Sequence, residues 1–110
     1  MTVIAGHYTY RVRWSAEDGE HLGTVAEMPS LSWAAGEPAA AFEGIRALVA
    51  DVLVDMAAQG ETPPAAIADR SYSGKFMVRV TPETHRQLAI EAAEQNVSLN
   101  RLVASRVIGT

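Results

Sequence analysis

The chain has no cysteine among its 110 residues, so disulfide bonds and thiolate metal sites are excluded. It also lacks internal repeats, an apolar run long enough to span a membrane, and a signal-peptide pattern at its start. From these absences we expect a soluble protein of the cytoplasm. The histidines have no metal-ligand spacing, and no glycine-rich phosphate loop or nucleophile elbow is present. We therefore expect neither a metal ion nor another cofactor.

Acidic and basic residues are distributed unevenly along the chain, whose formal net charge is −4. Residues 1–70 carry four arginines against ten acidic residues, a balance of −6. Residues 71–110 carry five basic residues against three acidic ones, a balance of +2. An acidic half joined to a basic half indicates two partners of opposite charge.

The acidic half begins with a strand pattern. Residues 7–15 alternate between an aromatic and apolar face and a polar face, which predicts a half-buried strand with Trp14 in the core. A turn over residues 16–20 contains a glycine, where a positive φ is often required. A second strand is expected over residues 21–28, and a short third strand over residues 31–35.

A long amphipathic helix is expected after the strands. Pro38 stands at a first-turn position, and the apolar residues over 42–56 recur at spacings of three and four. Gly60 is a typical helix end, and the two adjacent prolines that follow cannot continue the helix. We therefore expect one domain over residues 1–60 and a linker over residues 61–73.

The remaining segment, residues 74–110, begins with a short pattern in which apolar and long polar side chains alternate. A lone strand leaves its backbone edges unpaired, so this strand is expected to pair with a second copy of the chain. A two-stranded ribbon of this kind fits the major groove of DNA. The face expected in the dimer core carries Phe76, Val78 and Val80, and the face expected to contact bases carries Lys75, Met77 and Arg79.

Two helices are expected after this strand, each with its own start signal. Thr81 is a favourable N-cap, with Pro82 at the first helical position. Asn96 is placed to end the first helix in a left-handed conformation, and Ser98 to cap the second helix. Free backbone amides at a helix start bind phosphate, so the expected phosphate-binding residues are Ser98, Leu99 and Asn100. The helices add three residues to the expected dimer core, namely Leu88, Leu102 and Val103.

The alternating strand, the Thr-Pro helix opening and the Asn-Val-Ser-Leu-Asn turn resemble the Arc-type ribbon-helix-helix superfamily. Together with the acidic half, they are similar to the HicB antitoxins of bacterial HicA/HicB toxin–antitoxin pairs. The N-terminal residues that carry this similarity are Tyr8-Thr-Tyr-Arg-Val, the Glu17-Asp-Gly turn, Thr24-Val-Ala-Glu-Met-Pro, the helix over 42–56 and Gly60-Glu-Thr-Pro-Pro.

The resemblance implies an α+β chain in which a small antiparallel sheet with one helix, a partial and inactive RNase H-like fold, precedes a ribbon-helix-helix domain. It implies an antitoxin that covers the active site of a HicA-like toxin, a small protein that cleaves messenger RNA. It also implies repression of its own operon by a homodimer, or a tetramer of paired dimers, on an inverted-repeat operator. The expected toxin contacts are the exposed acidic surface and the loop over residues 28–33.

Two other functions are compatible with the residues. The first is a stand-alone ribbon-helix-helix repressor whose N-terminal module senses a ligand or serves in oligomerisation. The second is a degenerate nuclease, because RNase H-like enzymes hold two metal ions with several carboxylates. Glu43, Asp51 and Asp55 share one helix, but no acidic residue lies inside the first strand. We therefore expect no catalytic residue and no enzyme activity.

Overall fold

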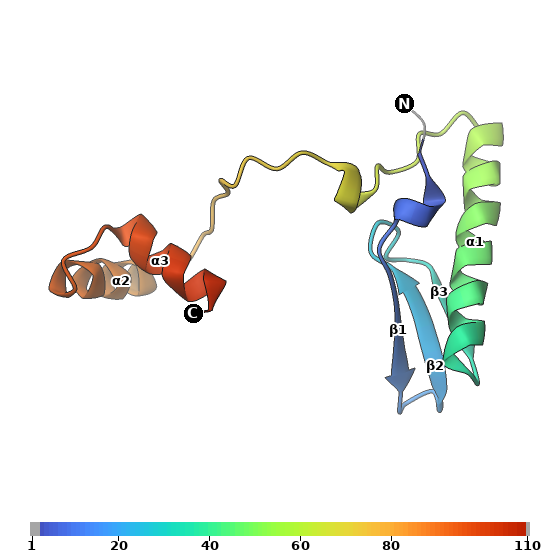
Figure 1. Cartoon of the computed structure of the whole chain (residues 1–110), viewed down its shortest axis with the longest axis horizontal. Coiled ribbons are helices and arrows are strands. Elements are labelled where there is room, and N and C mark those ends of the chain that lie inside the picture. The colour runs from blue at the N-terminus through green and yellow to red at the C-terminus, as the bar shows by residue number, and fades with distance from the viewer. Residues whose placement is uncertain (1–2, 110) are drawn as a thin grey trace. The chain divides into compact units, whose positions relative to one another are not determined.

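The computed structural model describes residues 3–109 of the chain. Within these residues the protein is α+β, as the sequence predicts, with a three-stranded antiparallel sheet and three α-helices (Figure 1). The chain divides into two compact units, Met1–Tyr72 and Ser73–Thr110. No helix in the described part of the chain is long and apolar enough to cross a membrane.

The first unit is built on a sheet with the strand order β1-β2-β3, and both pairings are antiparallel. Gly19, in the turn between the first two strands, has a φ of 65°, which glycine adopts at no steric cost. The first strand is shorter than predicted because Ala5–His7 form a 3₁₀ helix before it. The strands are β1 (Tyr10–Ser15), β2 (Glu20–Val25) and β3 (Ser32–Ala35).

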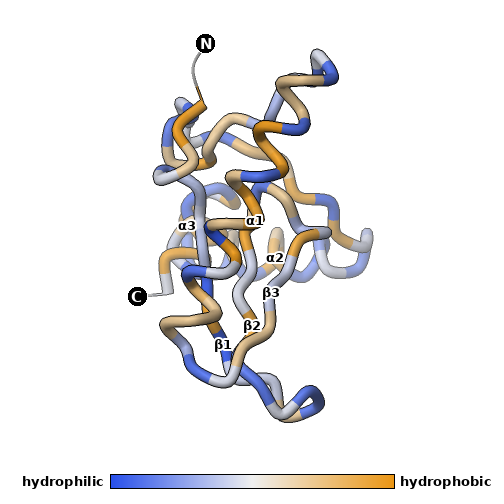
Figure 2. The backbone as a smooth tube through the Cα atoms, turned by 90° about the vertical axis from the view of Figure 1, so that its right-hand side faces the viewer, coloured by the Kyte–Doolittle hydropathy of each residue, from blue (hydrophilic) through white to orange (hydrophobic). Residues whose placement is uncertain are grey.

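Helix α1 (Pro38–Ala58) packs on one face of this sheet and contacts all three strands. Ala41, Ile45 and Val49 are fully buried at spacings of four, which places them on one side of the helix. Figure 2 shows how polar and apolar positions mix along the helix, as expected for an element with one buried side. The core is completed by residues from β2 and from the segments around the sheet, among them Tyr8, Val25, Met28 and Ala66.

Gly23 of β2 lies where the sheet and α1 approach most closely. A Cβ atom added there would lie 2.5 Å from the Ala41 carbonyl oxygen and 2.9 Å from Ile45 Cγ2. The first of these atoms belongs to the backbone, and the second to a fully buried side chain. Neither can move without disturbing the helix, so the close contact between α1 and β2 depends on glycine at this position.

We expect Gly23→Ala to lower the free energy of unfolding by about 1–3 kcal/mol, because the added methyl overpacks the contact with α1. Urea denaturation followed by circular dichroism measures this change. Gly36→Ala is the matched control, since a Cβ there would meet nothing within 4 Å. Equal stability of the two variants would contradict the packing of α1 on β2.

The two tryptophans are both exposed, and the prediction that Trp14 lies in the core is wrong. Trp14 is 57% exposed, and its ring packs edge-on against His21 at a centroid distance of 5.1 Å. Trp14 lies near the end of the edge strand β1 and is paired with His21. The buried residues of α1 contact the sheet at Gly23, which is paired with Val12, so they do not cover Trp14. Trp33 of β3 lies against Gly44 of α1 and is also partly exposed.

The segment after α1 returns to the sheet instead of leaving the unit. Ala66 is buried in the core, and the Tyr8 hydroxyl donates a hydrogen bond of 2.7 Å to the Pro64 carbonyl oxygen. A second 3₁₀ helix, Ile67–Asp69, follows within this segment. The unit extends to Tyr72. This differs from the linker predicted over residues 61–73, and we call residues 63–72 the return segment.

Candidate nucleic-acid interface

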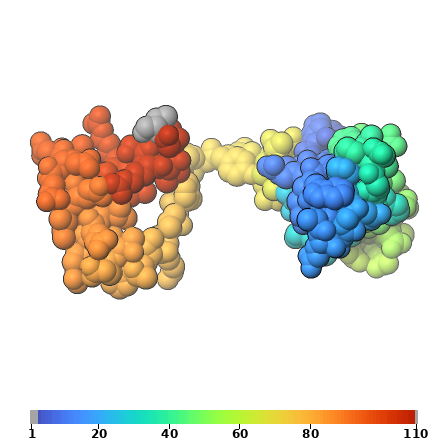
Figure 3. Space-filling model, turned by 90° about the horizontal axis from the view of Figure 1, so that it is seen from below, coloured from blue at the N-terminus to red at the C-terminus, as the bar shows by residue number. Residues whose placement is uncertain are grey.

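Residues 75–80, predicted as a strand, have no regular secondary structure in the single chain. All six are exposed, including the apolar ones; Met77 is 84% exposed and Val78 is 64% exposed. The space-filling view shows the chain before α2 standing apart from the helices over part of its length (Figure 3). A strand requires a neighbour for its backbone hydrogen bonds, so the predicted strand is not confirmed for one copy of the chain.

A tight turn directly precedes this segment. The Ser73 hydroxyl accepts a hydrogen bond of 3.1 Å from the Lys75 backbone N–H and donates one of 3.3 Å to the Lys75 carbonyl oxygen. Gly74, between them, has a φ of 83°, a conformation that a residue with a Cβ rarely adopts. The turn therefore fixes where the segment over residues 75–80 begins.

Helix α2 (Pro82–Glu94) begins at the predicted residue and by the predicted mechanism. The Thr81 side chain accepts a hydrogen bond of 3.2 Å from the Thr84 backbone N–H, and Pro82 occupies the first helical position. Glu83 lies in the first turn, where its charge suits the helix dipole, and it forms an ion pair of 3.2 Å with Arg86. These local interactions define the helix start independently of any partner.

The turn into helix α3 (Leu99–Ile108) also follows the prediction. Asn96 has a φ of 57°, in the left-handed region, and the Ser98 hydroxyl accepts a hydrogen bond of 3.0 Å from the Arg101 N–H. The amides of Leu99 and Asn100 precede the first intrahelical hydrogen bond and lie at the same helix start. These amides, with the Ser98 cap, have the position that suits a phosphate group.

Helices α2 and α3 pack on each other around a small core. Ala92 and Leu102 are buried, whereas Leu88 and Val103, both expected in the dimer core, are half-buried. Arg106 of α3 forms an ion pair with Glu91 of α2 and joins the two helices at the surface. A larger group of apolar side chains in this unit is exposed, namely Phe76, Met77, Val78, Val80, Ile90, Val107 and Ile108.

The three predicted core residues of the segment before α2 therefore lie in solvent, as do the three predicted base contacts. Phe76, Met77, Val78 and Val80 are all apolar and exposed within six consecutive residues, and an exposed apolar segment of this kind often marks a site of interaction with another molecule. Lys75 and Arg79 form no ion pair with any residue over 3–109, so both cations are available to an external partner. In a single copy of the chain, the apolar and cationic side chains of residues 75–80 are therefore exposed, as expected for a surface that binds another molecule.

The candidate contacts for a protein partner lie on the first unit. Glu43, Asp51 and Asp55 are exposed along α1, and no group of three or more potential metal ligands gathers among the described residues. The loop over residues 28–33 is only partly available, because Met28 is buried in the core. The exposed part of this predicted contact therefore lies in the residues after Met28.

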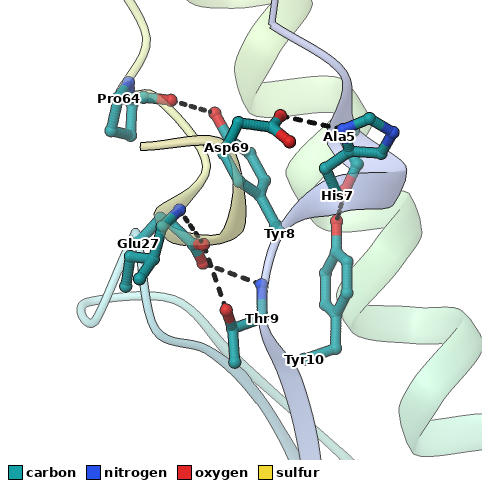
Figure 4. Close-up of polar contacts among 9 residues, drawn as sticks. Ala5, His7, Tyr8, Thr9, Tyr10, Glu27, Pro64 and Asp69 are labelled. Carbon is teal, nitrogen blue, oxygen red and sulfur yellow. Dashed lines mark hydrogen bonds and ion pairs between the residues drawn. The ribbon is translucent and has the colours of Figure 1, made fainter. Parts of the chain in front are cut away.

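Sequence reasoning did not identify Glu27, which follows β2 and organises the return segment (Figure 4). Its carboxylate accepts hydrogen bonds from the Thr9 N–H at 2.9 Å, the Thr9 hydroxyl at 3.2 Å and the Ile67 N–H at 2.9 Å. Burial favours the neutral form of this carboxyl, but these hydrogen bonds outweigh it, so the pKa of Glu27 is lowered from its ordinary value. The charged form of Glu27 therefore holds two distant segments together.

Figure 4 also shows two polar contacts that attach the return segment to residues before β1. Burial, followed by the nearby Glu27 charge, raises the pKa of Tyr8, so its hydroxyl remains a donor to Pro64. His7 Nδ1 lies 2.8 Å from Asp69 Oδ2 at the surface. We call Glu27 and its partners Thr9 and Ile67 the Glu27 junction.

The structure thus describes a two-unit α+β protein, in which a three-stranded sheet with one helix is followed by a pair of capped helices with an exposed apolar segment before them. Residues 58–107 match the model of the HicB family. This match includes the return segment, residues 75–80 and nearly all of α2 and α3. Neither the curated proteins nor the solved structures contain a match to the chain.

Proposed function

We propose that the chain is an antitoxin that neutralises a HicA-like, messenger-RNA-cleaving toxin and represses its own operon by binding operator DNA as a dimer. One observation carries the proposal. The segment that matches the HicB family contains residues 75–80, whose alternating cationic and apolar side chains are all exposed beside two capped helices. In the proposed complex, residues 75–80 pair with the same segment of a second copy on one side and contact DNA with their other face.

In the proposed dimer, residues 75–80 of two copies pair as antiparallel strands. Phe76, Val78 and Val80 then face the helices of both copies and become buried. Burying a large apolar side chain contributes about 1.5–3 kcal/mol, so the six side chains of a dimer supply roughly 10 kcal/mol before the cost of association. The paired strands also satisfy backbone groups that one copy leaves unpaired.

The opposite face of the ribbon would enter the major groove. Arg79 and Lys75 can donate hydrogen bonds to guanine O6 and N7, and Met77 can contact a thymine methyl group. The amides of Leu99 and Asn100, at the start of α3, would bind backbone phosphates and fix the position of the ribbon. The two-fold symmetry of such a dimer fits an inverted-repeat operator.

The first unit would bind the toxin. Residues 1–70 have a charge balance of −6, and the carboxylates of Glu43, Asp51 and Asp55 are exposed on α1. A toxin that binds RNA needs a basic surface, so attraction between opposite charges would accelerate association, and salt would weaken it. No catalytic role for this unit is part of the proposal.

A stand-alone repressor is the second candidate, and the extent of the family match favours it. The match begins at residue 58, so the sheet and nearly all of α1 lie outside it. In this candidate the second unit still binds operator DNA, whereas the first unit senses a ligand or serves in oligomerisation. The two candidates differ in whether the first unit binds a toxin.

The experiment that separates these candidates co-expresses a fragment of residues 1–72 with a basic protein encoded by a neighbouring gene. The core of the first unit lies within this fragment, and ending it at Tyr72 keeps the return segment intact. We expect the fragment to restore growth and to co-purify with the toxin, but not to bind operator DNA. Rescue by the full chain alone, or by residues 73–110 alone, would contradict the proposed division between the units.

A further inference from the structure

The return segment is held on the first unit at three points. The Pro64 carbonyl oxygen accepts from the Tyr8 hydroxyl at 2.7 Å, and the Ile67 N–H donates to Glu27 at 2.9 Å. Asp69 lies 2.8 Å from His7, and between these points Ala66 is buried in the core. The segment is therefore part of the first unit along most of its length.

Glu27 is the centre of this attachment because it binds both sides. Its carboxylate accepts from the backbone and the side chain of Thr9, next to β1, and from the backbone of Ile67 in the return segment. Hydrogen bonds to an ionised acceptor are stronger than those between neutral groups. Removing the carboxylate would leave the Ile67 amide without an acceptor and would detach the middle of the segment.

We infer that the Glu27 junction sets the length of free chain between the two units. With the return segment attached, Ser73 and Gly74 alone lie between Tyr72 and Lys75, and two residues span at most about 7 Å. With all three attachment points released, the free chain runs from Glu61 to Gly74, and its fourteen residues span up to about 50 Å. The attached state therefore shortens the free chain that joins the first unit to residues 75–80.

The attachment of the return segment by Glu27 concerns the first unit alone and is tested independently of the proposed function. The short free chain of two residues rests on the proposed ribbon, because residues 75–80 have no regular secondary structure in the single chain. Its consequence for regulation rests on the proposed function. In a dimer bound to an operator, a short tether keeps the two first units, and any protein they bind, close to the DNA. A tether of fourteen residues would lower the effective concentration of one unit near the other and remove this restraint.

Limited trypsin digestion of the full-length protein tests the inference, because Arg70 lies inside the return segment and donates a hydrogen bond of 3.0 Å to the Ala65 carbonyl oxygen. Cleavage requires local opening of the chain around the scissile bond. We expect Glu27→Ala to increase the rate of cleavage after Arg70 at least tenfold, measured by mass spectrometry. The matched control, Glu43→Ala, removes an exposed carboxylate of α1 and should leave this rate unchanged.

Cleavage after Arg11, Arg13 and Arg46 provides the internal reference, because these residues lie in β1 and α1 and report unfolding of the whole unit. The inference requires faster cleavage after Arg70 with unchanged cleavage at these three sites. An unchanged rate at Arg70 would overturn it. An equal increase at all four sites would also overturn it, since Glu27 would then stabilise the unit as a whole.

A distance measurement provides a second test, and the absence of cysteine makes it simple. Spin labels on Glu17→Cys and Gln87→Cys report the separation of the two units within one chain when labelled chains are diluted with unlabelled ones. We expect a broader distance distribution when Glu27→Ala is added to the labelled chain. A distribution of unchanged width would show that the Glu27 junction does not restrain the tether.

Discussion

Replacing Val78 with aspartate is expected to convert a dimer into a monomer. In the proposed ribbon, Val78 is buried at the dimer core, and Val78→Asp would place two carboxylates close together in an apolar environment. Burying an unpaired charge costs several kcal/mol. The dissociation constant of the dimer should therefore rise at least 100-fold, and operator binding should be lost with it. Sedimentation velocity over a range of concentrations measures the change.

Val54→Asp is the matched control for this substitution. Val54 lies on α1 and is 72% exposed in the single chain, compared with 64% for Val78. If exposure in one chain decided the outcome, both variants would behave as the unmodified protein does. Only pairing of residues 75–80 predicts that Val78→Asp dissociates the dimer while Val54→Asp does not. A fully dimeric Val78→Asp variant would contradict the ribbon.

Replacing Arg79 with alanine is expected to abolish recognition of the operator sequence while leaving the dimer intact. Arg79 is exposed, and in the ribbon it faces away from the dimer core. Loss of a base contact costs about 1–3 kcal/mol, which is roughly 5- to 150-fold in affinity for each half-site. Gel-shift competition with operator DNA and scrambled DNA measures the loss of specificity.

Two variants define the controls for this prediction. Arg13→Ala removes the same charge from an exposed position in β1 and should leave operator binding unchanged. Lys75→Ala should reduce specificity as Arg79→Ala does, or weaken binding to all sequences equally if Lys75 contacts phosphate. Wild-type binding by the double variant at Lys75 and Arg79 would show that residues 75–80 do not contact the bases.

The helices of both units were predictable because their signals are local. Thr81, Pro82 and Ser98 occupy cap positions that depend on residues no more than three apart, and the structure places each of them as predicted. The left-handed Asn96 is local in the same sense. Such interactions form within one short stretch of chain, and the sequence of that stretch is sufficient to identify them.

The strand over residues 75–80 was predicted from its alternation, but it does not form in one copy of the chain. Alternation indicates which side chains share a face, whereas a strand also needs a neighbouring backbone. Within the described residues of the second unit, no segment supplies that neighbour. The sequence pattern of a strand without a neighbouring backbone is the physical basis for proposing that a second chain provides that backbone.

The Glu27 junction was not predictable from the sequence because its partners are far away along the chain. Thr9 and Ile67 lie 18 and 40 residues from Glu27, and no spacing rule relates them. Helix α1 ends at Ala58, before the left-handed Gly60, and the adjacent prolines at positions 63 and 64 led to the prediction of a linker. Whether the chain after a helix stays attached depends on such long-range contacts, and composition does not reveal them.

The most direct test of the central claim is amide hydrogen exchange over residues 75–80 in the unmodified protein. The single chain offers no strand partner for these amides within its described residues. The ribbon predicts slow exchange at alternate positions of this segment at high protein concentration, and faster exchange on dilution below the dissociation constant. Exchange at the rate of an unstructured peptide, at a concentration where the protein is otherwise folded, would contradict the ribbon and the DNA-binding role proposed for it.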